Sequence, residues 1–324
     1  GLGPAVGFSI ASQGRPVLFV DDLYGGSGTI LGWFARARKD GLKVAGVASS
    51  RFEDVIQAAR AFDCIKRLKS SVILDVTDRN PEAAAANIRA LFGTEVRTIA
   101  AKEINAYYAS ADRAEANRWA DEWIRNAEKI VEPMREEIVK SGIMYVAMRD
   151  LMKHHKSPAI TMDCLRLIYG GRIPSYPCLG FSQLNNDGFV GACEADLDST
   201  ISMLVMNYLT GRPGFISDPV IDTSKDQIIY AHCVAPTKVF GPDGRRNPYH
   251  LRSHSEDRKG AVMRSLLPLG EMTTTLKFLP WKKEVILHYG KSVENVDEEK
   301  ACRTKLAVRG PDTRKLFKNW SAHW

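Results

Sequence analysis

The chain has 324 residues, 44% of them hydrophobic and 26% charged, a composition typical of a folded protein with two or three domains. Its net charge of +7 comes from dispersed basic residues, which argues against a nucleic-acid partner. No stretch reaches the roughly 18 consecutive apolar residues that a membrane span needs, so no membrane partner is expected. Gly1-Leu-Gly-Pro4 lacks the pattern of a signal peptide, which predicts a cytoplasmic protein.

The first 48 residues show one strand-helix-strand pattern. An apolar run over 15–22 predicts a buried parallel strand, and 43–48 predicts a second one after a helix. Between them, Gly25-Gly-Ser-Gly28 invites interpretation as a phosphate-binding loop, because backbone amides at a helix start attract anions. Its spacing fits neither the dinucleotide fingerprint nor the Walker pattern, so the glycines favour a tight strand-to-helix turn.

From Ser49 the alternation of strands and helices restarts and continues to about residue 210. The charged run 111–140 has the apolar spacing of an amphipathic helix, and Pro133 should kink or divide it. The segment 176–188 is rich in turn-forming residues. Strands are predicted over 72–76, 96–101 and 159–165, and helices over 52–68, 81–92, 144–153 and 199–209.

Beyond Thr210-Gly-Arg-Pro213 the chain changes to short β-like pieces, which predicts an antiparallel domain. The strands expected there cover 214–217, 227–231, 238–240, 270–278 and 284–289. We therefore predict an α/β fold in which Rossmann-like parallel-sheet domains precede a C-terminal antiparallel β domain. The expected domains are 1–48, 49–210 and 211–324.

Two acids have the surroundings of functional side chains. Glu194 has small and apolar neighbours, which places it at a strand end or a helix start, and Asp218 is expected to end an apolar strand before Pro219. Functional side chains of α/β proteins collect at strand ends. Although the two acids are 24 residues apart, one helix and one strand between them would allow them to converge. A buried carboxylate needs a cation, a metal or hydrogen bonds.

Three segments carry a resemblance to a known family. Ala192-Cys-Glu-Ala-Asp196, Thr210-Gly-Arg-Pro-Gly-Phe-Ile-Ser-Asp218 and Tyr230-Ala-His-Cys-Val-Ala-Pro236 resemble the L-fucose isomerase and L-arabinose isomerase superfamily. In that family a Glu and a second acid some two dozen residues later bind a divalent metal, usually manganese, together with a His near the C-terminus. The resemblance makes residues 1–48 the remnant of the family's first α/β domain.

The resemblance also implies the site and the reaction. Glu194 and Asp218 would be both metal ligands and candidate catalytic bases, with His323 as the C-terminal metal ligand. His232 would be a fourth ligand or a group that supports the ligands. The implied protein is a metal-dependent aldose-ketose isomerase that acts on a sugar through an enediol, in a homo-oligomer, trimer or hexamer. Mn²⁺ suits such ligands and would stabilise the enediolate while a carboxylate moves the proton.

Alternatives remain open at this stage. A non-catalytic sugar-binding relative, or an epimerase or lyase that uses the same metal-enediolate site, would share these residues. Gln183, Asn185, His254 and Glu256 are candidates for binding sugar hydroxyls. However, Asn-Asn-Asp-Gly188 is equally good turn chemistry, and the segment around His254 fits a salt-bridged loop as well. The six cysteines, without a C-x-x-C pair, are typical of reduced, buried thiols.

Overall fold

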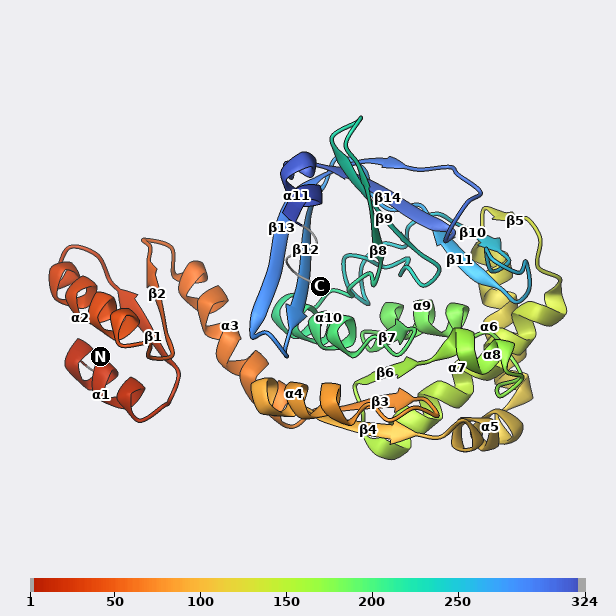
Figure 1. The fold of residues 1–324 in the computed structure, drawn as a ribbon, viewed down its shortest axis with the longest axis horizontal. Coiled ribbons are helices and arrows are strands. Elements are labelled where there is room, and N and C mark those ends of the chain that lie inside the picture. Colours follow the sequence, from red (N-terminus) through yellow and green to blue (C-terminus); the bar gives the residue numbers. More distant parts are fainter. Residues whose placement is uncertain (1–2, 320–324) are drawn as a thin grey trace. The chain divides into compact units, whose positions relative to one another are not determined.

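The structure, a computed structural model, describes residues 3–319, and the chain divides into two compact units between Arg67 and Leu68 (Figure 1). In the first unit, the parallel strands β1 (Val17–Asp21) and β2 (Val44–Ala48) pair over five residues. The glycine-rich segment is the tight turn that the sequence favoured, because Gly26 adopts a left-handed conformation (φ 96°) directly before α2. Its helices are α1 (Pro4–Ser12), which was not predicted, α2 (Ser27–Lys39) and most of α3 (Phe52–Lys69), whose last two residues belong to the second unit.

The second unit is built on a parallel sheet in the order β4-β3-β6-β7. Its strands are β4 (Glu95–Ile99), β3 (Val72–Val76), β6 (Ala159–Met162) and β7 (Val190–Cys193), and the last two are buried at every residue. The chain runs from β3 outward to β4 and then from β6 outward to β7. Right-handed crossovers in these opposite directions place α4 (Glu82–Phe92) and α9 (Cys178–Asn186) on opposite faces of the sheet.

The long charged run is divided as expected around Pro133. Asp112 caps α6 (Arg113–Asn126) by accepting hydrogen bonds from two backbone amides, and α7 (Arg135–His155) begins two residues after the proline. The helix predicted over 144–153 is therefore the C-terminal half of α7. Between α6 and α7 lies the short strand β5 (Lys129–Ile130), and α5 (Ala101–Ser110) precedes them.

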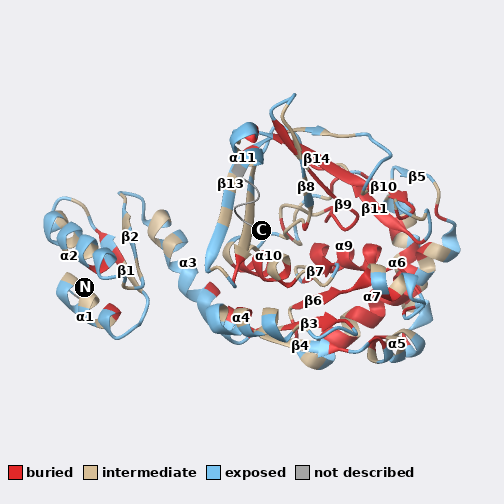
Figure 2. Cartoon of the chain, viewed as in Figure 1, coloured by how far each residue is buried: buried red, intermediate tan, exposed pale blue. Residues whose placement is uncertain are grey.

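The segment 176–188 is largely helical, which corrects the prediction of a turn-rich connection. Its helix α9 packs closely against α7, since a Cβ on Gly180 would lie 2.3 Å from Cε of Met148. It also approaches β7 closely, because a Cβ on Gly191 would lie 2.9 Å from Cα of Phe181. Many residues of α9 are polar types that favour turns. These two glycines let the helix pack closely enough to lie in the interior all the same (Figure 2).

Towards the C-terminus the chain forms a five-stranded antiparallel sheet in the order β12-β13-β14-β9-β8. A smaller sheet pairs β11 with β10 and β10 with β5. The strands are β8 (Asp218–Asp222), β9 (Gln227–His232), β10 (Tyr249–Arg252), β11 (Val262–Ser265), β12 (Met272–Leu279), β13 (Glu284–Asn295) and β14 (Thr304–Arg309). The remaining helices are α8 (Cys164–Tyr169), α10 (Leu197–Thr210) and α11 (Thr313–Asn319).

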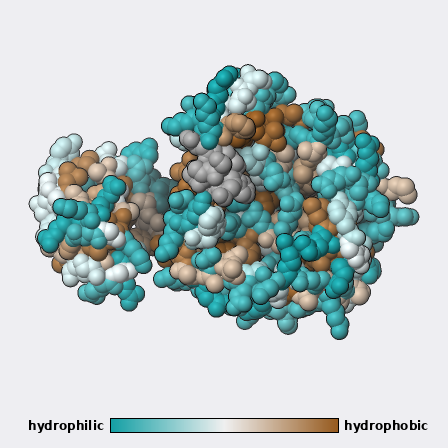
Figure 3. Space-filling model, in the orientation of Figure 1, coloured by the Kyte–Doolittle hydropathy of each residue, from teal (hydrophilic) through white to brown (hydrophobic). Residues whose placement is uncertain are grey.

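The C-terminal half confirms the predicted class and corrects its details. An α/β fold with parallel sheets and a C-terminal antiparallel sheet is confirmed, whereas the Rossmann-like detail and the three domain boundaries stay predictions. The segments 214–217 and 238–240 are not strands, and Asp218 begins β8 instead of ending a strand. No described helix is long and apolar enough to cross a membrane. Hydrophilic side chains cover much of the face drawn in Figure 3.

Candidate active site

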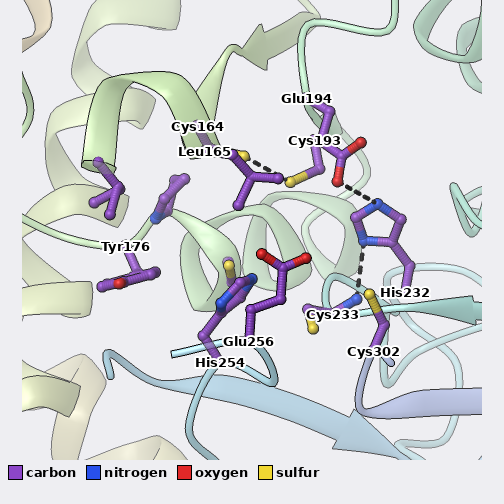
Figure 4. Close-up of a pocket in the computed structure, with 13 residues that line it drawn as sticks. Cys164, Leu165, Tyr176, Cys193, Glu194, His232, Cys233, His254, Glu256 and Cys302 are labelled. Carbon is purple, nitrogen blue, oxygen red and sulfur yellow. Dashed lines mark hydrogen bonds and ion pairs between the residues drawn. The ribbon is translucent and has the colours of Figure 1, made fainter. Parts of the chain in front are cut away.

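A pocket in the second unit lies where the carboxyl ends of β6 and β7 meet the segments after β9 and β10 (Figure 4). Its cavity volume of ≈ 20 Å³ has room for a water molecule or a metal ion. Four of the residues that the sequence singled out line it, namely Glu194, His232, His254 and Glu256.

Glu194 is held at the pocket by an unusual turn after β7. Both Glu194 (φ 65°) and Ala195 (φ 55°) adopt the left-handed conformation, which costs about 1–3 kcal/mol for each non-glycine residue. The turn is fixed on both sides. The backbone amide of Ala195 donates to the carbonyl of Met162 on β6 (2.9 Å), and the side chain of Asp196 accepts from the amide of Ser199 at the start of α10 (2.9 Å).

The nearest ionisable partner of Glu194 is His232, the last residue of β9. Nε2 of His232 lies 3.7 Å from Oε1 of Glu194, and the imidazole is almost completely buried. Nδ1 of the same ring accepts a hydrogen bond from the backbone amide of Cys233 (2.9 Å), as Figure 4 shows. Because Nδ1 is an acceptor, the neutral ring carries its proton on Nε2, which faces Glu194. In this conformation His232 supports Glu194 better than it would bind a cation through Nε2.

The surroundings of Glu194, and burial above all, favour its protonated form. Partial burial raises the pKa of Glu194, and the carboxylates of Asp218 and Glu256 raise it further, whereas His232 lowers it. Asp218 itself is exposed at the start of β8 and does not line the pocket. The structure thus brings the charge of Asp218 into the range of Glu194 without a direct contact between the described atoms.

On another side of the pocket, His254 is supported by two neighbours. Its Nδ1 lies 3.3 Å from Oδ1 of Asp257, and its ring lies 5.5 Å from the ring of Tyr176. The hydroxyl of Tyr176 donates to the same Asp257 carboxylate. Although burial opposes it, this hydrogen bond helps to keep the pKa of Asp257 below its usual range, so the carboxylate stays ionised beside His254. Glu256 accepts a hydrogen bond from the hydroxyl of Tyr169 (3.0 Å).

Sequence reasoning missed that five of the six cysteines line this one pocket. They are Cys164, Cys178, Cys193, Cys233 and Cys302. One ligand atom each of Cys193, Glu194 and His232 lies within 4.8 Å of the others, a spacing that a metal ion could bridge. The only signal in the sequence was local, because Cys193 directly precedes Glu194 and Cys233 directly follows His232.

The other predicted site residues lie elsewhere. Gln183 is buried in α9, where its amide accepts from Trp123 Nε1 (3.0 Å) and donates to Asp187 (2.7 Å). Asn185 is fully buried and pairs with both the amide and the carbonyl of Gly191, at 3.0 and 2.9 Å. Neither lines the pocket. His323 lies outside the described residues, so its place as a metal ligand stays a prediction.

Comparison with known proteins relates the chain to sugar isomerases. No family model matches it. The sulfoquinovose isomerase of Alkalicoccus urumqiensis is 24% identical over 224 residues, 66% of this chain and 49% of that protein. Sulfoquinovose isomerases of Clostridium sp. (strain MSTE9) and Priestia aryabhattai are 27% and 24% identical over 44% and 56% of this chain, and over 32% and 41% of their own length. The chain thus spans about half, or less, of the length of these relatives.

Proposed function

We propose that this chain acts as an aldose-ketose isomerase on a sugar, through an enediol intermediate and with a divalent metal. The observation that carries the proposal is the left-handed turn that holds Glu194 at a pocket of ionic size, beside His232. The similarity to sugar isomerases supports the same reaction class. The finer assignment to the L-fucose and L-arabinose isomerase superfamily belongs to this proposal as well.

The donor atoms at the pocket are compatible with a cation. Glu194 offers a carboxylate oxygen, and Asp218 contributes a second negative charge nearby. In our proposal these two acids and His323 hold Mn²⁺, which would stabilise negative charge on the two sugar oxygens between which the carbonyl moves. His232 would support Glu194 without binding the metal. Its Nδ1 accepts from the amide of Cys233, so its Nε2 carries a proton and points to Glu194.

The chain's own residues supply the proton chemistry. The reaction removes a proton from C2 and returns it to C1, and a carboxylate with a raised pKa can do both. In the metal-free protein Glu194 has that property, and the Nε2 proton of His232 would keep its carboxylate oriented. His254, oriented by Asp257, and Glu256 would hydrogen-bond the sugar hydroxyls at the entrance.

The proposal also covers the substrate, the oligomeric state and the cellular location of the protein. The relatives are named for sulfoquinovose, a sulfonated hexose, so this sugar is the first to test on the present chain. We further propose a cytoplasmic homo-oligomer, trimer or hexamer, in line with the family resemblance.

The test is ketose formation by the purified protein from a panel of sugars that includes sulfoquinovose, L-fucose and L-arabinose, with Mn²⁺ and with chelator. Metal-dependent conversion of one sugar would support the proposal. Sugar binding without conversion would favour a non-catalytic relative. Exchange of the C2 proton with solvent without ketose would favour an epimerase.

A further inference from the structure

Two thiols meet at the carboxyl end of the parallel sheet. Cys193 is the last residue of β7 and pairs in register with Met162 of β6, while Cys164 lies two residues beyond Met162 at the start of α8. The two Sγ atoms are 3.0 Å apart, and Figure 4 shows them facing each other across the strand ends. A disulfide bond is about 2.0 Å long, so a shift of roughly 1 Å between the sulfurs would bring them to bonding distance.

The pair is buried but lines the cavity. Each cysteine is 4% exposed, and both line the pocket, which admits a molecule of the size of water. Hydrogen peroxide, a small neutral molecule of two oxygen atoms, is therefore the oxidant to test at this pair. Cys64 offers a contrast, because it is equally buried at 4% but lies on α3 in the other compact unit.

We propose that Cys164 and Cys193 form an oxidative modification site at which hydrogen peroxide converts the two thiols into a disulfide. One thiolate attacks a peroxide oxygen, the O–O bond breaks, and hydroxide leaves and takes up a proton as water, so that a sulfenic acid remains. The second thiol then displaces its hydroxyl as water and forms the S–S bond. Two thiols are oxidised by two electrons, and one peroxide is reduced to two waters.

The disulfide would act on the neighbouring carboxylate. Cys193 is bonded directly to Glu194, and its Sγ belongs to the three atoms that lie within 4.8 Å of one another. Linking Sγ to Cys164 draws it away from Glu194 and His232 and restrains the left-handed turn. We therefore expect oxidation to abolish turnover and a thiol reductant to restore it. This consequence rests on the proposed function, whereas formation of the bond does not.

The experiment is peroxide titration of the chelator-treated protein, followed by alkylation of the remaining thiols and peptide mass spectrometry. The expected product is a peptide pair joined through Cys164 and Cys193, lighter by two hydrogen atoms and released by dithiothreitol. The Cys64→Ser control should form the same pair. Cys164→Ala should form no link and should carry a sulfenic or sulfinic acid on Cys193 instead, with an unchanged melting temperature as the check on folding.

Two results would overturn the proposal. One is that Cys164 and Cys193 stay fully alkylatable at peroxide doses that oxidise the partly exposed Cys302. The other is a link between Cys233 and Cys302, which also hydrogen-bond to each other, while Cys164 and Cys193 remain thiols. Both results are read by mass, so a protein without isomerase activity would still test the modification site.

Discussion

Helix α9 and the pocket are both rich in buried polar side chains, but they satisfy them differently. In α9 every polar group that the sequence offered for sugar binding has a protein partner, as Asn185 shows with its two hydrogen bonds to Gly191. At the pocket, the Glu194 side chain is 43% exposed, has only a distant contact to the buried His232, at 3.7 Å, and has a raised pKa. A buried amide with complete hydrogen bonding stabilises the fold, whereas an acid kept short of partners in a cavity is available for chemistry.

The largest effect is expected from Glu194→Gln, which keeps the shape of the side chain and removes its ability to take up a proton. We expect kcat to fall about 1,000-fold, within the range for loss of general acid-base catalysis, with an unchanged melting temperature. Glu271→Gln makes the same chemical change on an exposed residue and should leave kcat as it is. If both variants retain the wild-type rate, Glu194 does not carry the proton transfer.

Asn185→Ala should lower stability and leave substrate binding unchanged, the reverse of Glu194→Gln. The substitution leaves the amide and carbonyl of Gly191 without partners in the interior, so the free energy of unfolding should drop by about 3 kcal/mol. Urea denaturation measures this change, and Gln57→Ala on the exposed surface of α3 should change it by about 0.5 kcal/mol or less. KM of the remaining folded protein should be unchanged. A raised KM at wild-type stability would move Asn185 from the framework into the substrate site.

His232→Gln separates a supporting role from a metal ligand. Glutamine has both an acceptor for the Cys233 amide and a donor for Glu194, so we expect a loss of about 10-fold in kcat with metal affinity largely kept. His232→Ala should lose up to about 100-fold. His288→Gln, a partly buried histidine of β13 that contacts Tyr230, serves as the matched control. Loss of Mn²⁺ binding in both His232 variants, measured by calorimetry, would identify His232 as a ligand.

The smallest effect concerns Asp75, an acid of the framework with one unpaired carboxyl oxygen among the described residues. Its Oδ1 and the facing Oγ1 of Thr161 have no hydrogen-bond partner among the described residues, and burial raises the pKa of Asp75 to about 7. A raised pKa favours the protonated folded state, so this contribution to stability is present at pH 4 and is lost as the pH rises through about 7.

Asp75→Asn should therefore melt above the wild type at pH 8 by a few degrees, with the difference shrinking towards pH 4. Melting temperatures across this range check the sign. A difference that stays constant with pH would show that Asp75 is ionised in the folded protein at all of these values.

The sequence predicted the regular part of the fold because its patterns are local. The apolar run 72–76 needs only its own composition to be recognised as a strand, and β3 covers those residues. Helix α9 was missed because its residues favour turns, and only the close contacts at Gly180 and Gly191 explain why they form a helix. Strand β14 was missed as well, since its place between β13 and β9 depends on partners far away in the sequence.

At the site, too, the local features could be predicted from the sequence and the contacts between distant segments could not. Glu194 could be placed after a strand because small and apolar residues precede it, and β7 does end at Cys193. The contact between His232 and Glu194 and the contact between Cys164 and Cys193 depend on how distant strand ends meet. No pattern within a single segment carries that information.

The central claim is that Glu194 moves a proton at a carbon of the sugar, and solvent isotope exchange tests it most directly. The protein is incubated with Mn²⁺ and the sugar it converts in deuterium oxide, and deuterium at C2 and C1 is followed by NMR. We predict metal-dependent incorporation by the wild type and by Glu271→Gln, and none above background by Glu194→Gln. Incorporation by Glu194→Gln at the wild-type rate would contradict the account.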